Sequence, residues 1–140
     1  WIDADQQFNY QQLCTLLESG HDFCSGWYIK ELSGLAMVAD WDEEYFESNL
    51  HMKFYHQDEI RQREEPFEAS YCGFGFTKVA SSIIRELKYP YFRQRMVTIG
   101  DHSENCSEDV TFCLDVWEKC GIKPTILPEL RVNHLKEMYI

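Results

Sequence analysis

Apolar residues recur at helical spacing in three stretches of the chain, and a glycine or a proline follows each stretch. These stretches predict helices over residues 8–19, 77–87 and 108–120. Short apolar runs between them predict strands, which are expected at residues 1–2, 23–28, 35–38, 50–55, 68–72, 125–127 and 130–132. Helices and short strands alternate without a repeat. The pattern therefore predicts an α/β or mixed α+β fold, a sheet with helices packed on it.

Two polar stretches interrupt this pattern. Residues 40–65 are acidic and mixed, and beyond the short strand within them we expect an exposed excursion or a hairpin with a solvated face. Residues 101–105 are polar and predict a loop. Ser107 is then expected to cap the helix over residues 108–120, with Gly121 as its C-cap.

Length and charge limit the number of domains and the kinds of partner that are expected. The 140 residues correspond to one domain, 1–140, and 24 acidic against 13 basic residues give a formal net charge of −11. Such a chain repels phosphate backbones, which argues against nucleic acid as a partner. An anionic substrate would need a local basic patch or a bound cation. No apolar run approaches the roughly 20 residues of a membrane span.

The N-terminal sequence carries no basic segment followed by an apolar one, so no signal peptide is expected, and we place the protein in the cytoplasm. The chain begins with Trp1 in the middle of a motif and is expected to be a fragment or a processed product. Its six cysteines form no C-x-x-C pair, so they are expected to be small core residues, without disulfides or a zinc knuckle.

The first candidate for chemistry is Asp3-Ala4-Asp5, which follows two bulky apolar residues. Two carboxylates just past a strand end can reach the crevice in which α/β sheets bind ligands. At this spacing Asp3 and Asp5 can share one hard divalent cation. The alternative interpretation is a polar turn after a strand.

Other candidates lie in the second half of the chain. Glu108 and Asp109 open a helix, where acids are favoured by the helix dipole; alternatively, one of them serves as a general base. His134 follows a strand and, beside carboxylates, would suit Mn²⁺ or a similar metal. It could equally be structural or exposed.

A glycine-rich stretch and several aromatic residues could contact a substrate. The stretch Gly73-Phe74-Gly75-Phe76 lacks a phosphate-loop pattern but permits a tight turn and a close backbone approach to a ligand. The aromatic side chains that could stack on a sugar ring, or else belong to the core, are Trp27, Tyr28 and Trp41.

Taken in order, three stretches resemble the second half of a family 2 glycosyltransferase-like domain, with its GT-A or nucleotide-diphospho-sugar transferase fold. They are the DxD strand with its successor at residues 1–28, the glycine turn and helix at residues 73–92, and the acidic helix start through the closing strand and histidine at residues 107–134. The resemblance implies a partial GT-A-like mixed sheet that lacks the N-terminal nucleotide-binding half. Residues 40–65 match no motif of the family.

The resemblance also implies an activity and its residues. It implies metal-dependent transfer of a sugar from a nucleotide-sugar donor to an acceptor hydroxyl, with Mn²⁺ or Mg²⁺. Asp5 and His134 would bind the metal, and Asp3 would touch the ribose or a metal-bound water. Asp109, or else Glu108, would deprotonate the acceptor.

The resemblance assigns the acceptor side to the glycine turn, with Gly73, Phe74 and Gly75 as candidate contacts beside Trp27. Without the upstream half we expect little activity from the chain alone, and a homo-oligomer that covers the N-terminal strand. A non-catalytic binding or assembly module on the same scaffold is the alternative function. A metal-dependent phosphate-ester hydrolase is the third.

Overall fold

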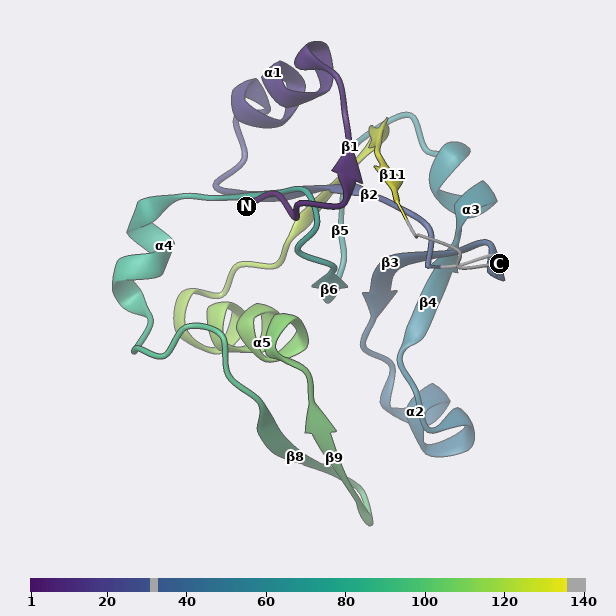
Figure 1. Cartoon of the computed structure of the whole chain (residues 1–140). Helices are drawn as coiled ribbons and strands as arrows, with labels where there is room; N and C mark the ends of the chain where they lie inside the picture. Colours follow the sequence, from purple (N-terminus) through teal and green to yellow (C-terminus); the bar gives the residue numbers. More distant parts are fainter. Residues whose placement is uncertain (31–32, 136–140) are drawn as a thin grey trace.

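The computed structural model describes residues 1–30 and 33–135 of the chain. Its helices are α1 (Tyr10–Glu18), α2 (Glu43–Asn49), α3 (Gln57–Arg61), α4 (Ser81–Glu86) and α5 (Glu108–Cys120). Its strands are β1 (Gln6–Gln7), β2 (Phe23–Trp27), β3 (Leu35–Asp40), β4 (Lys53–His56), β5 (Phe67–Glu68), β6 (Tyr71–Cys72), β7 (Thr77–Val79), β8 (Arg95–Ile99), β9 (His102–Cys106), β10 (Thr125–Arg131) and β11 (Asn133–His134). Figure 1 shows these elements along the chain.

The described strands form four small sheets. The largest has the order β5-β10-β2-β7, in which β10 and β2 run parallel and the other neighbours are antiparallel. A second sheet has the order β4-β3-β6, and the pairs β1-β11 and β8-β9 complete the set. The predicted mixed α/β class is therefore confirmed. The expected GT-A-like sheet is not confirmed, because pairing is divided among separate small sheets.

The core lies where the central sheet meets α5. All five residues of β2 are buried, since neighbouring strands flank it on both sides and helices cover it. The ring of Phe112 in α5 stacks on Phe92 at 4.7 Å and meets Phe74 at 4.9 Å and Phe23 at 6.0 Å. This aromatic cluster fixes α5 and the glycine-rich stretch relative to β2. Helix α1 packs on the same sheet, against β2, β7 and β10.

Helix α5 has the predicted boundaries, and its C-terminal glycine has the predicted geometry. Gly121 adopts a left-handed φ of 67° and donates its amide to the carbonyl of Trp117 at 2.9 Å. At the N-terminus of α5, the hydrogen bonding of the predicted cap Ser107 differs from the expectation. The Ser107 hydroxyl makes no capping hydrogen bond to the backbone and donates instead to the carboxylate of Asp109.

Three predicted elements were wrong in detail. The helix expected from Thr77 begins only after Ala80, because Thr77–Val79 pairs with β2 as β7. The loop expected over residues 101–105 is mostly strand, since β9 pairs with β8 along its whole length. The two strands expected on either side of Pro128 are one strand, β10. Pro128 lies where the register between β10 and β2 is irregular. A proline has no amide proton to donate, but no regular strand-to-strand hydrogen bond is needed at this point.

The acidic segment over residues 40–65 is more ordered than the sequence suggested. It contains α2, β4 and α3, and each helix buries one large apolar side chain, Phe46 in α2 and Ile60 in α3. Strand β4 pairs antiparallel with β3, as a hairpin would. Strand β4 of this segment lies beside β3 (Figure 1).

All six cysteines are free thiols, and Cys24, Cys72 and Cys113 are buried. Burial raises the pKa of the Cys72 thiol well above its ordinary value, and its neighbour Cys113 adds to the shift. Cys24, Cys72 and Cys113 are therefore packed as small core residues. In the part of the chain that the structure describes, no helix is both long and apolar enough to span a membrane.

Candidate functional site

The N-terminal segment runs along the glycine-rich stretch. Ile2 forms an antiparallel bridge with Phe76, and the amide of Thr77 donates to the carbonyl of Trp1 at 2.9 Å. The amide of Asp3 donates to the carbonyl of Gly75 at 3.0 Å. Backbone pairing therefore places the two aspartates of the DxD sequence directly beside the turn that was predicted as the acceptor side.

The C-terminal strand closes over the same segment. In the antiparallel pair β1-β11, Gln6 lies opposite His134 and Gln7 opposite Asn133. The amide of Leu135 donates to the carbonyl of Asp5 at 2.8 Å. Figure 1 shows β1 and β11 side by side at the edge of the central sheet. Both ends of the described chain thus meet at one place.

This pairing brings together two predicted metal-binding residues. His134 Nε2 lies 2.8 Å from Asp5 Oδ2, across a separation of 129 positions in the sequence. Asp5 is half exposed, while the His134 side chain is largely covered. The ring of His134 lies 5.4 Å from that of Tyr28. The carboxylate is therefore open to a ligand, and the imidazole that contacts it is held against an aromatic wall.

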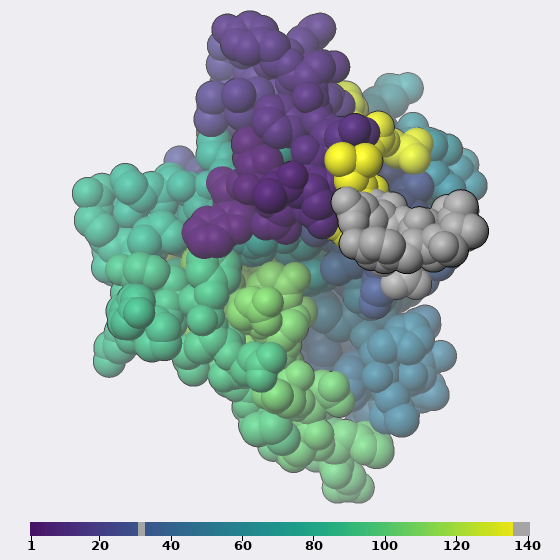
Figure 2. All heavy atoms as spheres, in the orientation of Figure 1, coloured from purple at the N-terminus to yellow at the C-terminus, as the bar shows by residue number. Residues whose placement is uncertain are grey.

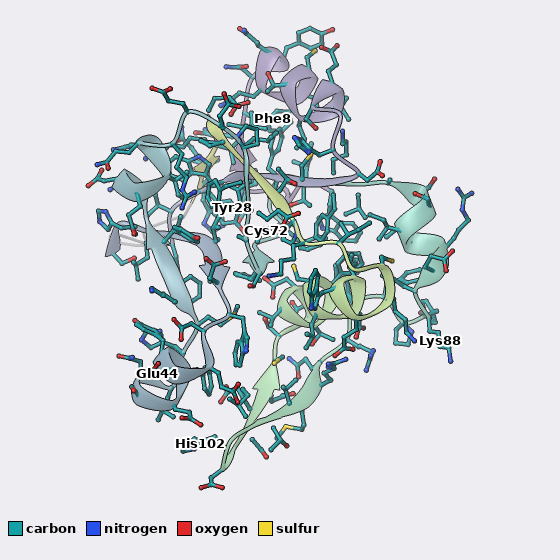
Figure 3. All side chains as sticks on the ribbon, turned by 180° about the vertical axis from the view of Figure 1, so that it is seen from behind. Phe8, Tyr28, Glu44, Cys72, Lys88 and His102 are labelled. Atoms are coloured by element: carbon teal, nitrogen blue, oxygen red, sulfur yellow. The ribbon has the colours of Figure 1, made fainter. Side chains whose placement is uncertain are left out.

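Tyr28 owes its position to the central sheet. It directly follows β2, and His134 follows β10, the parallel neighbour of β2. The carboxyl ends of parallel strands lie at the same edge of a sheet, which is where open α/β sheets bind ligands. The site therefore occupies the expected edge. Figure 3 shows Tyr28 near Cys72 in the interior, whereas Glu44, Lys88 and His102 lie at the periphery.

Tyr28 also connects the aspartates of the site. Burial raises the pKa of its phenol well above the ordinary value, the backbone amide of Gly75 opposes the rise by a hydrogen bond, and the charges of Asp3 and Asp109 add to it. Both carboxylates therefore lie within electrostatic range of the Tyr28 hydroxyl. A methyl group on Gly73 would overlap that hydroxyl oxygen, so glycine is required at this close approach.

Asp109 is held in a fixed orientation at the start of α5. Its Oδ2 accepts a hydrogen bond of 2.6 Å from the hydroxyl of Tyr71, and its Oδ1 accepts from Ser107 and from the amide of Val110. Burial, followed by the adjacent Asp109 charge, raises the pKa of Tyr71 far above its ordinary value, so Tyr71 remains a donor. Glu108 is exposed. Of the two candidate bases, Asp109 is thus the oriented one.

Two predicted substrate contacts are core residues instead. Trp27 is 1% exposed, and its indole nitrogen donates to the carbonyl of Pro128 at 2.8 Å. Phe74 is buried in the aromatic cluster with Phe112. Neither ring presents a face to a sugar. The bulky apolar character that suggested stacking is used here to join the glycine turn and β2 to the core.

Two of the three residues that were predicted to bind a metal come together in the structure. Within residues 1–30 and 33–135, no three His, Cys, Asp or Glu side chains converge closely enough to hold a metal alone. Asp5 and His134 meet, but Asp3 does not join them in such a group. They supply one carboxylate oxygen and one imidazole nitrogen, so a cation bound between them would need further ligands from outside this pair; a mixed oxygen and nitrogen set suits Mn²⁺ better than Mg²⁺, which prefers oxygen.

A separate hollow of about 430 Å³ lies along α5, on the side of the β8-β9 hairpin. Trp41, Val97, Leu114 and Trp117 contribute to its mostly apolar wall. Of the residues predicted to contact a substrate, Trp41 lines it, whereas the predicted metal ligands and candidate bases do not. We therefore place the candidate site where Asp5, His134 and Tyr28 converge, since those groups can do chemistry and the walls of the hollow are mainly packing residues.

Comparisons with known proteins give a fold neighbour and no family. No protein-family model matches the chain, and no curated protein matches it. Among solved structures, A197 from STIV, a viral protein, superposes with a TM-score of 0.55 and 18% sequence identity. The alignment covers 97% of this chain and 56% of that protein, so the chain spans about half of its neighbour's length. At this identity the likeness concerns the fold alone.

These findings overturn the resemblance drawn from the sequence. We expected membership of the family 2 glycosyltransferase-like domains, and that assignment was wrong, because no model of any family matches the chain. The three stretches that carried it are nevertheless adjacent in space, at residues 1–5, 73–77 and 131–135. Short motifs in a given order are consistent with a shared site geometry, but they do not establish descent.

Sequence reasoning missed two residues of the site. Tyr71, which orients Asp109, lies in a short strand and had no motif around it. Gln6 directly follows Asp5, and the sequence suggested that it belongs to a polar turn, yet its side chain is buried. Gln6 can be recognised as a neighbour of the site only once the pairing of β1 with β11 is known. In that pairing Gln6 lies opposite His134, so both side chains project to the same face.

Proposed function

We propose that this chain takes part in the metal-dependent transfer of a sugar from a nucleotide-sugar donor to an acceptor hydroxyl. The contact between Asp5 and His134 carries the proposal, because it joins a carboxylate and an imidazole from opposite ends of the chain. A second carboxylate, Asp109, is near enough to Tyr28 for its charge to raise the pKa of that phenol, and the Tyr28 ring lies 5.4 Å from that of His134. We assign cation binding to Asp5 and His134, and proton acceptance to Asp109.

The cation-binding side would receive the donor diphosphate. A chain with a net charge of −11 repels an anionic donor, so a bound cation is required to attract it. Asp5 and His134 would hold that cation, which when bound neutralises the leaving diphosphate. Asp3, on the same segment, would contact the ribose or a water of the cation. Its backbone is already fixed against Gly75.

The proton-accepting side is Asp109. Its carboxylate would take the proton of the acceptor hydroxyl as that oxygen attacks the sugar. Tyr71, Ser107 and the Val110 amide fix the carboxylate before substrate arrives, so no reorientation is needed at the moment of proton transfer. The buried turn at Gly73 and Gly75 would form the wall between the two sides.

One observation favours a non-catalytic alternative. Both oxygens of Asp109 already accept hydrogen bonds within the chain, as a carboxylate with a structural purpose would. A binding or assembly module would keep the Asp5–His134 pair and use Asp109 only to anchor α5. This alternative retains nucleotide-sugar binding and loses turnover.

The experiment that tests the proposal measures binding first. Isothermal titration with UDP-glucose and GDP-mannose, with and without Mn²⁺, should show Mn²⁺-dependent binding. Asp5→Asn and His134→Gln should each weaken it at least about tenfold, since each removes one metal ligand. Asp22→Asn, an exposed aspartate outside the site, should leave it unchanged. Equal binding by the Asp5→Asn variant and the native chain would refute the proposal.

Turnover separates the two functions. We expect low transfer by this chain, because none of the residues assigned to the site is assigned to the nucleotide base. Asp109→Asn should lower that transfer by about 100-fold or more while Mn²⁺-dependent binding persists. Binding without any Asp109-dependent turnover, including in the longest natural form of the protein, would favour the binding module.

A further inference from the structure

Gln6 has an unusual environment beside the Asp5–His134 pair. Its side chain is 8% exposed, and neither its amide nitrogen nor its amide oxygen has a hydrogen-bond partner within the described chain. Unpartnered buried amides are rare in folded proteins, because each group loses its bonds to water and gains none in return. An explanation is therefore required for why this residue is not apolar.

Strand pairing shows where this amide is directed. Gln6 lies opposite His134 in the antiparallel pair β1-β11, and directly opposed residues project to the same face. The amide nitrogen occupies the space that a side chain on Gly75 would fill, next to the ring of Tyr28. Gln6 thus borders the proposed site through His134, Gly75 and Tyr28. Its neighbour Gln7 lies opposite Asn133, and both are exposed.

We infer that Gln6 is a ligand-binding residue of this site and that its amide binds a pair of neighbouring hydroxyl groups on a sugar. The inference rests on the proposed function. The amide offers one donor and one acceptor side by side, and two adjacent sugar hydroxyls offer the matching acceptor and donor. Rotation of the flexible side chain from Gly75 toward His134 would give the amide one hydrogen bond as donor and one as acceptor, whereas within the described chain it makes neither.

The ribose of the nucleotide and the transferred hexose both carry such hydroxyl pairs, so the experiment must distinguish them. The probes are UDP, UDP-glucose, GDP and GDP-mannose, each with Mn²⁺. The variant is Gln6→Met, which keeps the length of the side chain and removes both polar atoms. The matched control is Gln7→Met, on the opposite face of the same strand.

Two readouts are expected to move in opposite directions. Without ligand, Gln6→Met should unfold at a higher temperature than the native chain, because it removes an unbonded buried amide. With ligand, it should bind at least about tenfold more weakly. A loss for all four probes indicates the ribose, and a loss for UDP-glucose and GDP-mannose alone indicates the hexose. Gln7→Met should change neither readout.

A direct signal identifies the contact. The side-chain NH₂ resonances of Gln6, assigned by their absence from Gln6→Met in ¹⁵N-correlated spectra, should shift on addition of the bound probe with diamagnetic Mg²⁺ in place of paramagnetic Mn²⁺. Native-like affinity of Gln6→Met for every probe that the native chain binds would overturn the inference alone, as would a lower melting temperature with unchanged affinity. Absence of binding by the native chain itself would defeat the proposed function and this inference with it.

Discussion

At the scale of single residues, the site depends on side chains that orient other side chains. Tyr71 is 3% exposed and donates a hydrogen bond from its hydroxyl to Asp109, while the ring of Tyr28 lies 5.4 Å from that of His134. Tyr71 would not be identified by residue type, because buried tyrosines are common, and the sequence suggested Tyr28 only as a residue that could stack on a sugar ring. Their importance follows from the charged group that each contacts.

Tyr71→Phe should lower the free energy of unfolding by about 1.5–3 kcal/mol, the usual contribution of a hydrogen bond to a charged group. The ring remains, so packing against Phe54 is preserved and the loss reports the hydroxyl. Urea unfolding followed by fluorescence measures the change. Tyr89→Phe serves as the control, because the Tyr89 side chain is 83% exposed. Equal stability of the two variants would show that the bond to Asp109 contributes little.

At the scale of elements, α5 joins the site to the β8-β9 hairpin through charged groups. Arg95 in β8 donates to Asp115 at 2.8 Å and to Glu118 at 2.7 Å, both on α5. Arg93 adds a contact of 3.0 Å to Asp115. Figure 1 shows the hairpin projecting beyond α5, and these charged pairs hold its base against the helix. Such surface pairs individually contribute about 0.2–1 kcal/mol.

The pair between Arg95 and Glu118 should be visible in the pH dependence of stability. The hydrogen bond from Arg95 lowers the pKa of Glu118 below its ordinary value. A carboxyl group with a lowered folded-state pKa stabilises the fold above its unfolded-state pKa, and this contribution disappears as the pH falls through the folded value. Glu118→Gln should therefore lower the melting temperature at pH 7 by at most about 5 °C, and should have no effect at pH 3.

Melting curves of both proteins at the two pH values measure this difference. Glu64→Gln, an exposed residue, makes the same change in net charge and controls for the overall repulsion of the acidic chain. A difference between Glu118→Gln and native protein that persists at pH 3 would mean that the ion pair is not its cause.

At the scale of the whole molecule, both ends of the described chain build the site, and the N-terminal segment remains partly uncovered. Trp1 is 64% exposed and Ile2 is 40% exposed, although Trp1 contacts Phe92 at 4.7 Å between ring centroids. Figure 2 shows the N-terminal atoms as part of the outer surface next to the last described strand. The acidic segment over residues 40–65 does not cover them.

We expect this surface to be covered by a second copy of the chain, since exposed aromatic and aliphatic side chains favour association. Light scattering after size-exclusion chromatography should show a dimer, and Trp1→Ser should shift it toward monomer. Salt should strengthen the dimer, because it screens repulsion between two chains of net charge −11. Tyr89→Ser, at a more exposed aromatic position, should leave the dimer intact. A monomer at high protein concentration and high salt would exclude the expected assembly.

The sequence by itself determined the elements whose signals are local. Helix α5 has the predicted start and end, because its apolar spacing, its acidic first turn and Gly121 act within one segment. Strand β2 and the mixed α/β class were predicted for the same reason. Residue type and position also pointed to Asp5, Asp109 and His134 as candidate site residues. Of these three, Asp5 and His134 contact each other in the structure.

Only the tertiary structure decided which of these residues meet and which of the bulky ones are core. Trp27 and Phe74 resembled substrate contacts until β2 and α5 enclosed them, because burial depends on neighbours far away in the sequence. Thr77–Val79 forms a strand instead of the start of a helix because its backbone pairs with the edge of β2. The face of Gln6 was set by its register with His134, and a shift of one residue would have turned it to solvent.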